Sequence, residues 1–333
     1  MPRSANQQDL ARAAGVSVST VSRALSNARG ISAELRARIV KLAQELGYQG
    51  RGAQPGPGRF VRAYVTANVM SGGLVAFYSA VMEGIAKAAR SAGLELQIRL
   101  VQHQLDPARL QREADEMPAD GTLLVGIDLS GQIEAIFGPQ RPMVLVNTFD
   151  PQMRYDSVAP NNFYGAAWAT RLLLEAGHRH ILHLRDQIRW TTLQREQGFL
   201  SAIAGVSGAH GEILDIRDDG DRALEAAARA RKAGKSRWTA VFSVHDNGAI
   251  RLIHALENVG LAVPGDVSVI GFDDLPPAAM MTPRLSTMRV DCAAIGQQAI
   301  ALMLRRLDDP GAAVVQVETA VSPVTGGTIA QIS

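Results

Sequence analysis

The residues best suited to chemistry in this sequence are short hydroxyl side chains and one arginine near the N-terminus. The segment VSVSTVSRAL places Ser17, Thr20 and Ser22 within six residues and follows them with Arg23. Such hydroxyls donate hydrogen bonds to phosphate oxygens, and an arginine contacts guanine in bidentate fashion or binds a phosphate. This pattern therefore predicts nucleic-acid binding rather than catalysis.

The charge distribution points to the same partner. Residues 1–62 carry ten Lys and Arg against three acidic residues, a net +7, and the remainder carries 24 against 29, a net −5. A basic N-terminal module on an acidic body favours a polyanionic partner for that module alone. On charge alone, chance clustering on a solvated surface explains the asymmetry equally well.

Three short helical patterns surround these residues. Gly15 supplies a stop after the first pattern, and Ser17 is a suitable N-cap for a second helix that runs to about Leu25. Ser32 caps a third helix. The predicted inner faces are Leu10, Ala11 and Ala14, then Val21, Ala24 and Leu25, then Leu35, Ile39, Leu42, Ala43 and Leu46. Together the patterns predict a helix-turn-helix arrangement.

In this arrangement the second helix lies in the major groove of DNA. Val18 and Ser19 then stand at its first turn, where recognition helices contact base edges. The alternative is a plain three-helix bundle in which the serines and threonines serve only as caps. Several hydroxyls on one short helix, beside a strong basic excess, make that alternative the weaker one.

The segment LARAAGVSVSTVSRAL closely resembles the DNA-binding headpiece of the lactose-repressor (LacI/GalR) family, whose pattern is D-V-A-x-x-A-G-V-S-x-x-T-V-S-R. The third helix with ELGY agrees as well, and Ser26 departs from the usual Asn. The resemblance implies that Val18, Ser19 and Arg23 contact operator bases. The full candidate set for DNA binding is Ser17, Val18, Ser19, Thr20, Ser22, Arg23, Asn27 and Arg51.

From Phe60 onward, apolar runs alternate with helical patterns, which predicts two α/β lobes with parallel sheets. The segments FYSAVMEGI, EAGHRHI, REQGF, VPGDVSVIGFDD and TPRLSTMRVD follow the family order. The fold class expected is thus an all-α helix-turn-helix headpiece plus a periplasmic-binding-protein-like body of two Rossmann-like lobes. The expected domains are a headpiece at 1–49, a linker at 50–60 and a body at 61–333. The first lobe takes about 61–158 and 290–319, and the second about 159–289 and 320–333.

Parallel sheets bind ligands at the carboxyl ends of their strands, so two facing lobes predict an interlobe cleft for an effector. Arg195 is expected to open a helix, and Asp273 to end a strand, both facing this cleft. They match family positions that bind ligand hydroxyls or carboxylates; the alternative is a purely structural ion pair. Asn147 replaces a common Asp and still suits a hydroxyl. Phe77 supplies either apolar ligand contact or core packing.

Two departures from the family concern this cleft. His245 stands where many members have Asn, which predicts a different ligand or a pH-sensitive pocket. The strand end near residues 216–221 lacks the aromatic ring that stacks on sugars in several relatives, which weakens a plain hexose as effector. Trp190 is the candidate substitute platform. Cys292 is expected either to line the pocket or, more often in such cases, to be packed.

Several classes of function find no support in the sequence. A single cysteine excludes an intrachain disulfide framework, and neither a signal sequence nor a membrane-spanning run is present. The histidines of HRHILH do not suggest a metal site, because His180 and His183 would point to opposite faces of a strand. No acid–base pair or cofactor motif stands out. We therefore expect a cytoplasmic, nucleoid-associated bacterial protein that is not an enzyme and needs no metal or cofactor.

The function predicted is a homodimeric transcriptional regulator, most simply a repressor, that binds a pseudo-palindromic operator. A sugar, polyol or sugar acid that closes the cleft would shift the spacing of the two headpieces. One alternative is a body that binds a corepressor protein instead of a metabolite. A remoter one is an α/β enzyme fused to a DNA-binding head.

The stretch GRGAQPGPGR, from residue 50 to residue 59, departs most from the family. Relatives usually carry P-N-x-x-A-R-x-L here, a hinge helix whose Leu inserts into the central minor groove. Two prolines and four glycines oppose a helix, and Pro57 occupies the position of the inserted Leu. We expect no hinge helix, or one turn at most, and a flexible connection between headpiece and body.

Overall fold

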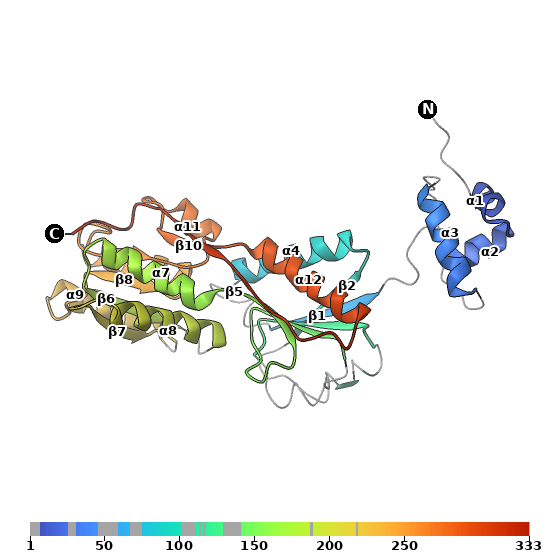
Figure 1. Cartoon of the computed structure of the whole chain (residues 1–333). Coiled ribbons are helices and arrows are strands. Elements are labelled where there is room, and N and C mark those ends of the chain that lie inside the picture. Colours follow the sequence, from blue (N-terminus) through green and yellow to red (C-terminus); the bar gives the residue numbers. More distant parts are fainter. Residues whose placement is uncertain are drawn as a thin grey trace. The chain divides into compact units, whose positions relative to one another are not determined.

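The computed structural model describes residues 7–25, 31–45, 59–66, 75–101, 111–112, 115, 118–128, 141–186, 189–217 and 219–332 (Figure 1). Contacts divide the chain into two compact units, Met1–Val61 with Ala89–Leu96 and Arg62–Ala88 with Gln97–Ser333. Asn27, Arg51 and the linker up to residue 58 lie outside the described residues, so the hinge expectation stays a prediction. In the described part of the chain, no helix has the length and apolar character needed to cross a membrane.

The headpiece is built from three helices, α1 (Gln7–Ala14), α2 (Val18–Leu25) and α3 (Ala33–Glu45). Gly15 turns the chain between α1 and α2 with a φ of 68°, a conformation that favours glycine. Both predicted caps are confirmed: the Ser17 hydroxyl accepts from the Thr20 amide at 3.1 Å, and that of Ser32 from the Leu35 amide at 3.2 Å. The buried core consists of Leu10, Ala11, Ala14, Val21, Ala24 and Ile39, with Val16, Ile31, Leu35 and Leu42 packed against it.

The first lobe of the body is a six-stranded sheet with the order β11-β5-β4-β3-β1-β2. Its strands are β1 (Phe60–Thr66), β2 (Glu95–Val101), β3 (Gly121–Val125), β4 (Met143–Val146), β5 (Asp156–Pro160) and β11 (Gln316–Thr319). β3, β4, β5 and β11 pair in parallel. Helix α12 (Cys292–Asp308) packs on these four strands, and α4 (Val75–Ser91) follows β1 in the chain.

The second lobe is a parallel four-stranded sheet with the order β7-β6-β8-β9. Its strands are β6 (His180–Arg185), β7 (His210–Asp215), β8 (Ala240–Ser243) and β9 (Ser268–Ile270). Its helices are α7 (Asn162–Glu175), α8 (Trp190–Ala204), α9 (Gly220–Lys232), α10 (Asp246–Asn258) and the short α11 (Pro276–Met280).

Two pairs of helices cover the two faces of this second sheet. In β6, Leu182 and Leu184 join the core formed with α9 and α10, whereas His183 between them stacks on Phe199 of α8. Successive side chains of a strand point to opposite faces, so α8 lies on the face opposite α9 and α10. Helix α7 packs beside α8 (Figure 1).

The chain crosses between the lobes three times. It passes from β5 to α7, returns through β10 (Thr287–Val290) to α12, and leaves β11 through β12 (Val321–Val324). Strands β10 and β12 pair antiparallel as a separate two-stranded ladder, with Thr287 opposite Val324 and Val290 opposite Val321. This ladder joins the two sheets, and β5, β10, β11 and β12 are strands that the sequence patterns did not predict.

Two details of the predicted elements are wrong. Helix α8 begins at Trp190, so Arg195 lies in its second turn and does not open it. Strand β9 ends at Ile270, three residues before Asp273. Asp273 has a φ of 119°, outside the extended region that a strand requires, and only an isolated bridge joins it to Arg289.

Candidate functional site

The body contains a pocket between the two lobes, with a volume of about 420 Å³ that includes its solvent-open mouth. The lining residues come from both lobes and are Phe77, Tyr78, Asn147, Asp186, Arg189, Thr191, Thr192, Arg195, His245 and Asp273.

The order of the strands explains why these residues meet. Asn147 follows β4 directly, Asp186 follows β6, and His245 comes two residues after β8. In the second sheet β6 has β7 on one side and β8 on the other, so successive connections leave in opposite directions there. Such switch points leave a crevice outside the carboxyl ends of the strands, where open α/β sheets bind ligands.

Arg195 and Asp273 form a buried ion pair at the second-lobe wall. Arg195 Nη2 lies 3.2 Å from Asp273 Oδ1, Nε donates to Asn162 Oδ1 at 2.8 Å, and Nη1 donates to the Val244 carbonyl at 2.6 Å. The guanidinium also stacks over the Phe272 ring at 3.8 Å. Burial raises the pKa of Asp273, an effect that the Arg195 charge opposes. The two residues form an ion pair that also lines the pocket, and their contact with a ligand stays a prediction.

His245 joins the same wall through two hydrogen bonds that fix its tautomer. It caps α10, and its Nδ1 accepts from the Gly248 amide at 2.9 Å. An Nδ1 that accepts leaves the proton of a neutral ring on Nε2. Nε2 therefore donates to Asp186 Oδ2 at 2.7 Å. The structure confirms that His245 faces the pocket; the pH sensitivity stays a prediction.

The opposite wall is formed around Tyr78, next to Phe77 on α4. Asn147 Nδ2 donates to the Tyr78 hydroxyl at 2.8 Å, and Arg189 Nη1 donates to the same oxygen. Asn147 adopts a φ of 55° and is buried, and among the described residues its Oδ1 has no hydrogen-bond partner. A buried acceptor without a donor is costly, so this oxygen calls for a donor from outside the described chain.

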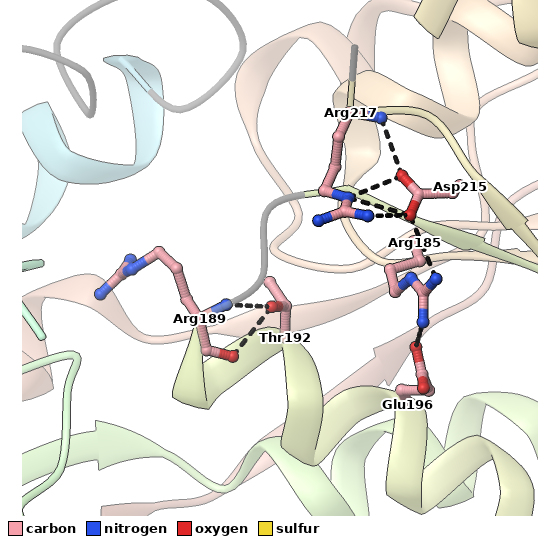
Figure 2. A network of polar contacts seen from close by, with 6 residues as sticks. All are labelled: Arg185, Arg189, Thr192, Glu196, Asp215 and Arg217. Carbon is pink, nitrogen blue, oxygen red and sulfur yellow. Dashed lines mark hydrogen bonds and ion pairs between the residues drawn. The ribbon is translucent and has the colours of Figure 1, made fainter.

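Arg189 reaches this wall from the second lobe. Its backbone amide donates to Thr192 Oγ1 at 3.0 Å, and that hydroxyl donates to the Arg189 carbonyl at 2.9 Å. Figure 2 shows these bonds at the start of α8, with the Arg189 side chain extending away from Thr192 and from the cluster of Arg185, Asp215 and Arg217. The start of α8 is therefore held locally, while the guanidinium extends to the Tyr78 wall of the pocket.

The predicted effector residues meet in the pocket with one exception, Trp190. Phe77 lines it and is 3% exposed, edge-on to Tyr78, so it also belongs to the core. Trp190 is absent from the lining residues, because its ring stacks on Phe149 with centroids 4.9 Å apart. Cys292 is buried at the start of α12 and is not a lining residue, and burial raises the pKa of its thiol to about 12.

Sequence reasoning missed half of the lining residues. These are Tyr78, Asp186, Arg189, Thr191 and Thr192. Four of them follow β6 within the segment RDQIRWTT, a polar run after a buried strand, which is the signal that would have identified them.

The predicted DNA-binding residues form the exposed side of α2 and its cap. Val18 is 40% exposed, and Ser17, Ser19 and Arg23 are exposed as well. The Ser17 hydroxyl lies 2.8 Å from those of Ser19 and Thr20, so the three hydroxyls form one hydrogen-bonded cluster at the start of the helix. The Ser22 side chain lies outside the described residues.

Comparison with known proteins agrees with both parts of the chain. Residues 7–50 match the model for bacterial regulatory proteins of the lacI family, and residues 170–329 match a periplasmic binding protein-like domain. The HTH-type transcriptional regulator GalS of Salmonella typhimurium is 30% identical over 90% of this chain and 88% of its own length. The ribose operon repressor of Haemophilus influenzae is 27% identical over 92% of this chain and 93% of its own length.

Solved structures show the same fold. The lac repressor dimer bound to operator and the anti-inducer ONPF superposes with a TM-score of 0.72, at 20% identity, over 98% of this chain and all of that one. The complex of the transcriptional regulator CelR with cellobiose has a TM-score of 0.69, at 22% identity, over 97% of this chain and 99% of that one. Together with the near-full-length similarity to GalS, these matches place the chain in the lacI family of DNA-binding bacterial transcriptional regulators.

Proposed function

We propose that this regulator is a homodimeric repressor whose operator affinity is set by a small, neutral, polyhydroxy effector bound in the interlobe pocket. Relatives include the ribose operon repressor of Haemophilus influenzae, and one structural neighbour holds cellobiose. Both names refer to neutral carbohydrates. The operator is a pseudo-palindrome, because one headpiece contacts too few base pairs for specificity and two related headpieces impose two-fold symmetry.

The observation that carries the effector class is the balance of donors and acceptors in the pocket. Asn147 Oδ1 is a buried acceptor with no donor among the described residues, which a ligand hydroxyl satisfies. Each nitrogen of the Arg195 guanidinium already meets a protein oxygen, and both Arg189 Nη atoms do as well. The charges of both arginines are also met by carboxylates, Asp273 and Asp128, with which a ligand carboxylate would compete, so the pocket favours hydroxyl donors over a sugar acid.

The headpiece supplies the operator contacts. In this proposal Val18, Ser19 and Arg23 contact bases, while the hydroxyls of Ser17, Thr20 and Ser22 bind phosphates, with Asn27 and Arg51 adding backbone contacts. The exposure of Val18 and Ser19 at the first turn of α2 supports the first assignment. The protein acts by binding and not as an enzyme, and it works in the cytoplasm, where bacterial DNA lies.

Thermal unfolding in the presence of matched ligand pairs tests the effector class. The panel contains neutral sugars and polyols together with the corresponding sugar acids. An effector at 100 times its dissociation constant stabilises the folded protein by about 2.7 kcal/mol. We expect stabilisation by a neutral member, and its loss in Asn147→Leu, which removes the unpartnered acceptor.

Stabilisation by the acid alone would contradict the neutral class. Silence across the whole panel would favour a corepressor protein as the signal. Operator binding is tested separately, by in vitro selection of DNA sites with the full-length chain, and recovery of two related half-sites is the expected result.

A further inference from the structure

We propose that Arg189 is a built-in latch that joins the two lobes across the pocket when no effector is bound. The residue belongs to the second lobe, between β6 and α8, yet its guanidinium binds only first-lobe groups among the contacts described above. The inference goes beyond effector recognition, since it concerns the ligand-free protein.

Three oxygen acceptors from three first-lobe segments hold the guanidinium. Nη1 donates to the Tyr78 hydroxyl of α4, and Nη2 donates to Asp128 Oδ1 at 3.2 Å and to the Asn147 carbonyl at 3.0 Å. These segments are the start of α4, the residues after β3 and the end of β4. One side chain therefore ties the amino end of α4 and the carboxyl ends of β3 and β4 to the second lobe.

The acceptors are themselves positioned for this role. Thr148 Oγ1 donates to Asp128 Oδ1 at 2.6 Å, and Asn147 Nδ2 donates to the Tyr78 hydroxyl at 2.8 Å. On the second-lobe side, Thr192 fixes the Arg189 backbone through two hydrogen bonds (Figure 2). These bonds hold the acceptors and the Arg189 backbone in place, which reduces the conformational entropy lost when the bridge forms.

The Arg189–Asp128 ion pair is partly exposed, so the latch is strong enough to join the lobes and weak enough to be broken. The side chain of Arg189 is 12% exposed and that of Asp128 is 39% exposed. Screening at the Asp128 side keeps the ion pair well below the energy of a buried one. Hydrogen bonds from the same cation to a hydroxyl and a carbonyl add to it.

The hydrogen bonds of Arg189 also imply that an effector competes with the latch. Tyr78 and Asn147 line the pocket and accept from this guanidinium, so an effector whose hydroxyl groups bind the Tyr78 oxygen or the Asn147 carbonyl competes with Arg189, whereas Asn147 Oδ1 stays open to it. This last step rests on the proposed function. The latch itself does not, and the experiment below contains no effector.

The test measures the distance between the lobes in the full-length, DNA-free protein by pulsed electron–electron double resonance. Spin labels are placed at Ser201→Cys on α8 and Ala301→Cys on α12, both exposed positions, in a Cys292→Ala background. Excess unlabelled chain is added, so that only distances within one chain of a dimer are recorded. We expect one narrow distribution of label-to-label distances for the protein with Arg189, and a broader distribution centred at a longer distance for Arg189→Ala.

Two further variants define the source of any change. Asp128→Asn keeps the shape of the side chain but removes its charge, and we expect a smaller shift in the same direction. Arg217→Ala breaks the ion pair with Asp215 inside the second lobe and should leave the distribution unchanged. An Arg189→Ala distribution identical to that of the parent, or an equal shift in Arg217→Ala, would overturn the latch.

Chemical rescue distinguishes loss of the Arg189 bridge from loss of packing between the lobes. Guanidinium chloride at about 20 mM lies far below the molar concentrations that unfold proteins, and it restores the missing cation to Arg189→Ala. We expect the narrow distribution to return with guanidinium and not with sodium chloride at equal ionic strength. A shift in Arg189→Ala that guanidinium leaves untouched would show that packing, and not the bridge, holds the lobes together.

Discussion

The headpiece and the pocket place their functional side chains in opposite environments. On α2 and its cap, Ser17, Val18, Ser19 and Arg23 lie within seven residues and are exposed. In the pocket, Asn147, Arg195, His245 and Asp273 come from four separate segments and are each 5% exposed or less.

This difference determines what a substitution can reveal. An exposed side chain on a short helix contributes little to folding unless it caps the helix, as Ser17 does, so its replacement tests binding almost alone. A buried polar side chain is bonded to other buried groups, so its replacement changes stability and ligand binding together. The two regions should therefore respond differently to equivalent changes.

The largest effect is expected at the buried ion pair. Arg195→Met leaves Asp273 buried without its cation and should lower the free energy of unfolding by about 3–5 kcal/mol. Arg217→Met, the matched control, breaks an exposed pair with Asp215 and should cost about 0–1 kcal/mol. Urea unfolding followed by tryptophan fluorescence reports this directly, because Trp168, Trp190 and Trp238 all lie in the second lobe. Equal midpoints for the two variants would contradict the assignment.

A second effect depends on pH. His183 is fully buried between Phe199 and Phe242, and burial lowers its pKa to about 3. A histidine in the unfolded chain titrates near pH 6.5. Below that pH the unfolded chain therefore binds a proton at His183 that the folded chain does not bind. The body should lose about 2 kcal/mol of stability between pH 6.5 and pH 5.

His183→Leu should remove this part of the pH dependence. His254→Ala, an exposed position on α10, serves as control and should keep the parent slope. Urea unfolding at several pH values measures the slopes. Parallel slopes for His183→Leu and the parent protein would show that His183 does not resist protonation in the folded state.

Smaller effects are expected from the two helix caps of the headpiece. Ser17→Ala and Ser32→Ala each remove one side-chain cap and should each cost the headpiece about 1 kcal/mol. Only Ser17 lies at the start of α2, so Ser17→Ala alone should also weaken operator binding. The comparison is made by fluorescence anisotropy at a temperature where both variants are folded. Equal losses of affinity would mean that Ser17 acts only through folding.

The smallest effect is expected in the linker. If the sequence from residue 50 to residue 58 forms no hinge helix, two glycines inserted after Gly56 should change operator binding by less than about 0.6 kcal/mol, the cost of doubling a loop. Gel mobility of circularly permuted operator fragments should show little bending. An abrupt loss of affinity, or a strong central bend, would indicate an ordered hinge.

The contrast between the regions also explains what the sequence could predict. In the headpiece, the turn at Gly15 and the caps at Ser17 and Ser32 follow from contacts within four residues, and all three were predicted. The alternation of strands and helices in the body was predicted too, because a buried five-residue strand such as β3 is a clear local signal.

The pocket was predicted only in part, because its contacts join distant segments. Arg195 and Asp273 were identified, but Arg189 was missed, since its role depends on Tyr78, Asp128 and Asn147 meeting in space. Trp190 was assigned to the pocket because an aromatic side chain beside a cleft suits a sugar. Its ring instead stacks on Phe149, a contact that no local pattern indicates.

The central claim is that the exposed side of α2 contacts the bases of the operator. Arg23→Ala tests it most directly, with affinities measured for the selected operator and for each single-base variant at several salt concentrations. We predict a loss of about 1–3 kcal/mol with relaxed specificity at one base pair of each half-site, and an unchanged urea midpoint for the tryptophan signal. Uniform weakening with a shallower salt dependence would reassign Arg23 to a phosphate. Unchanged binding to every sequence would contradict the assignment of α2 as the recognition helix.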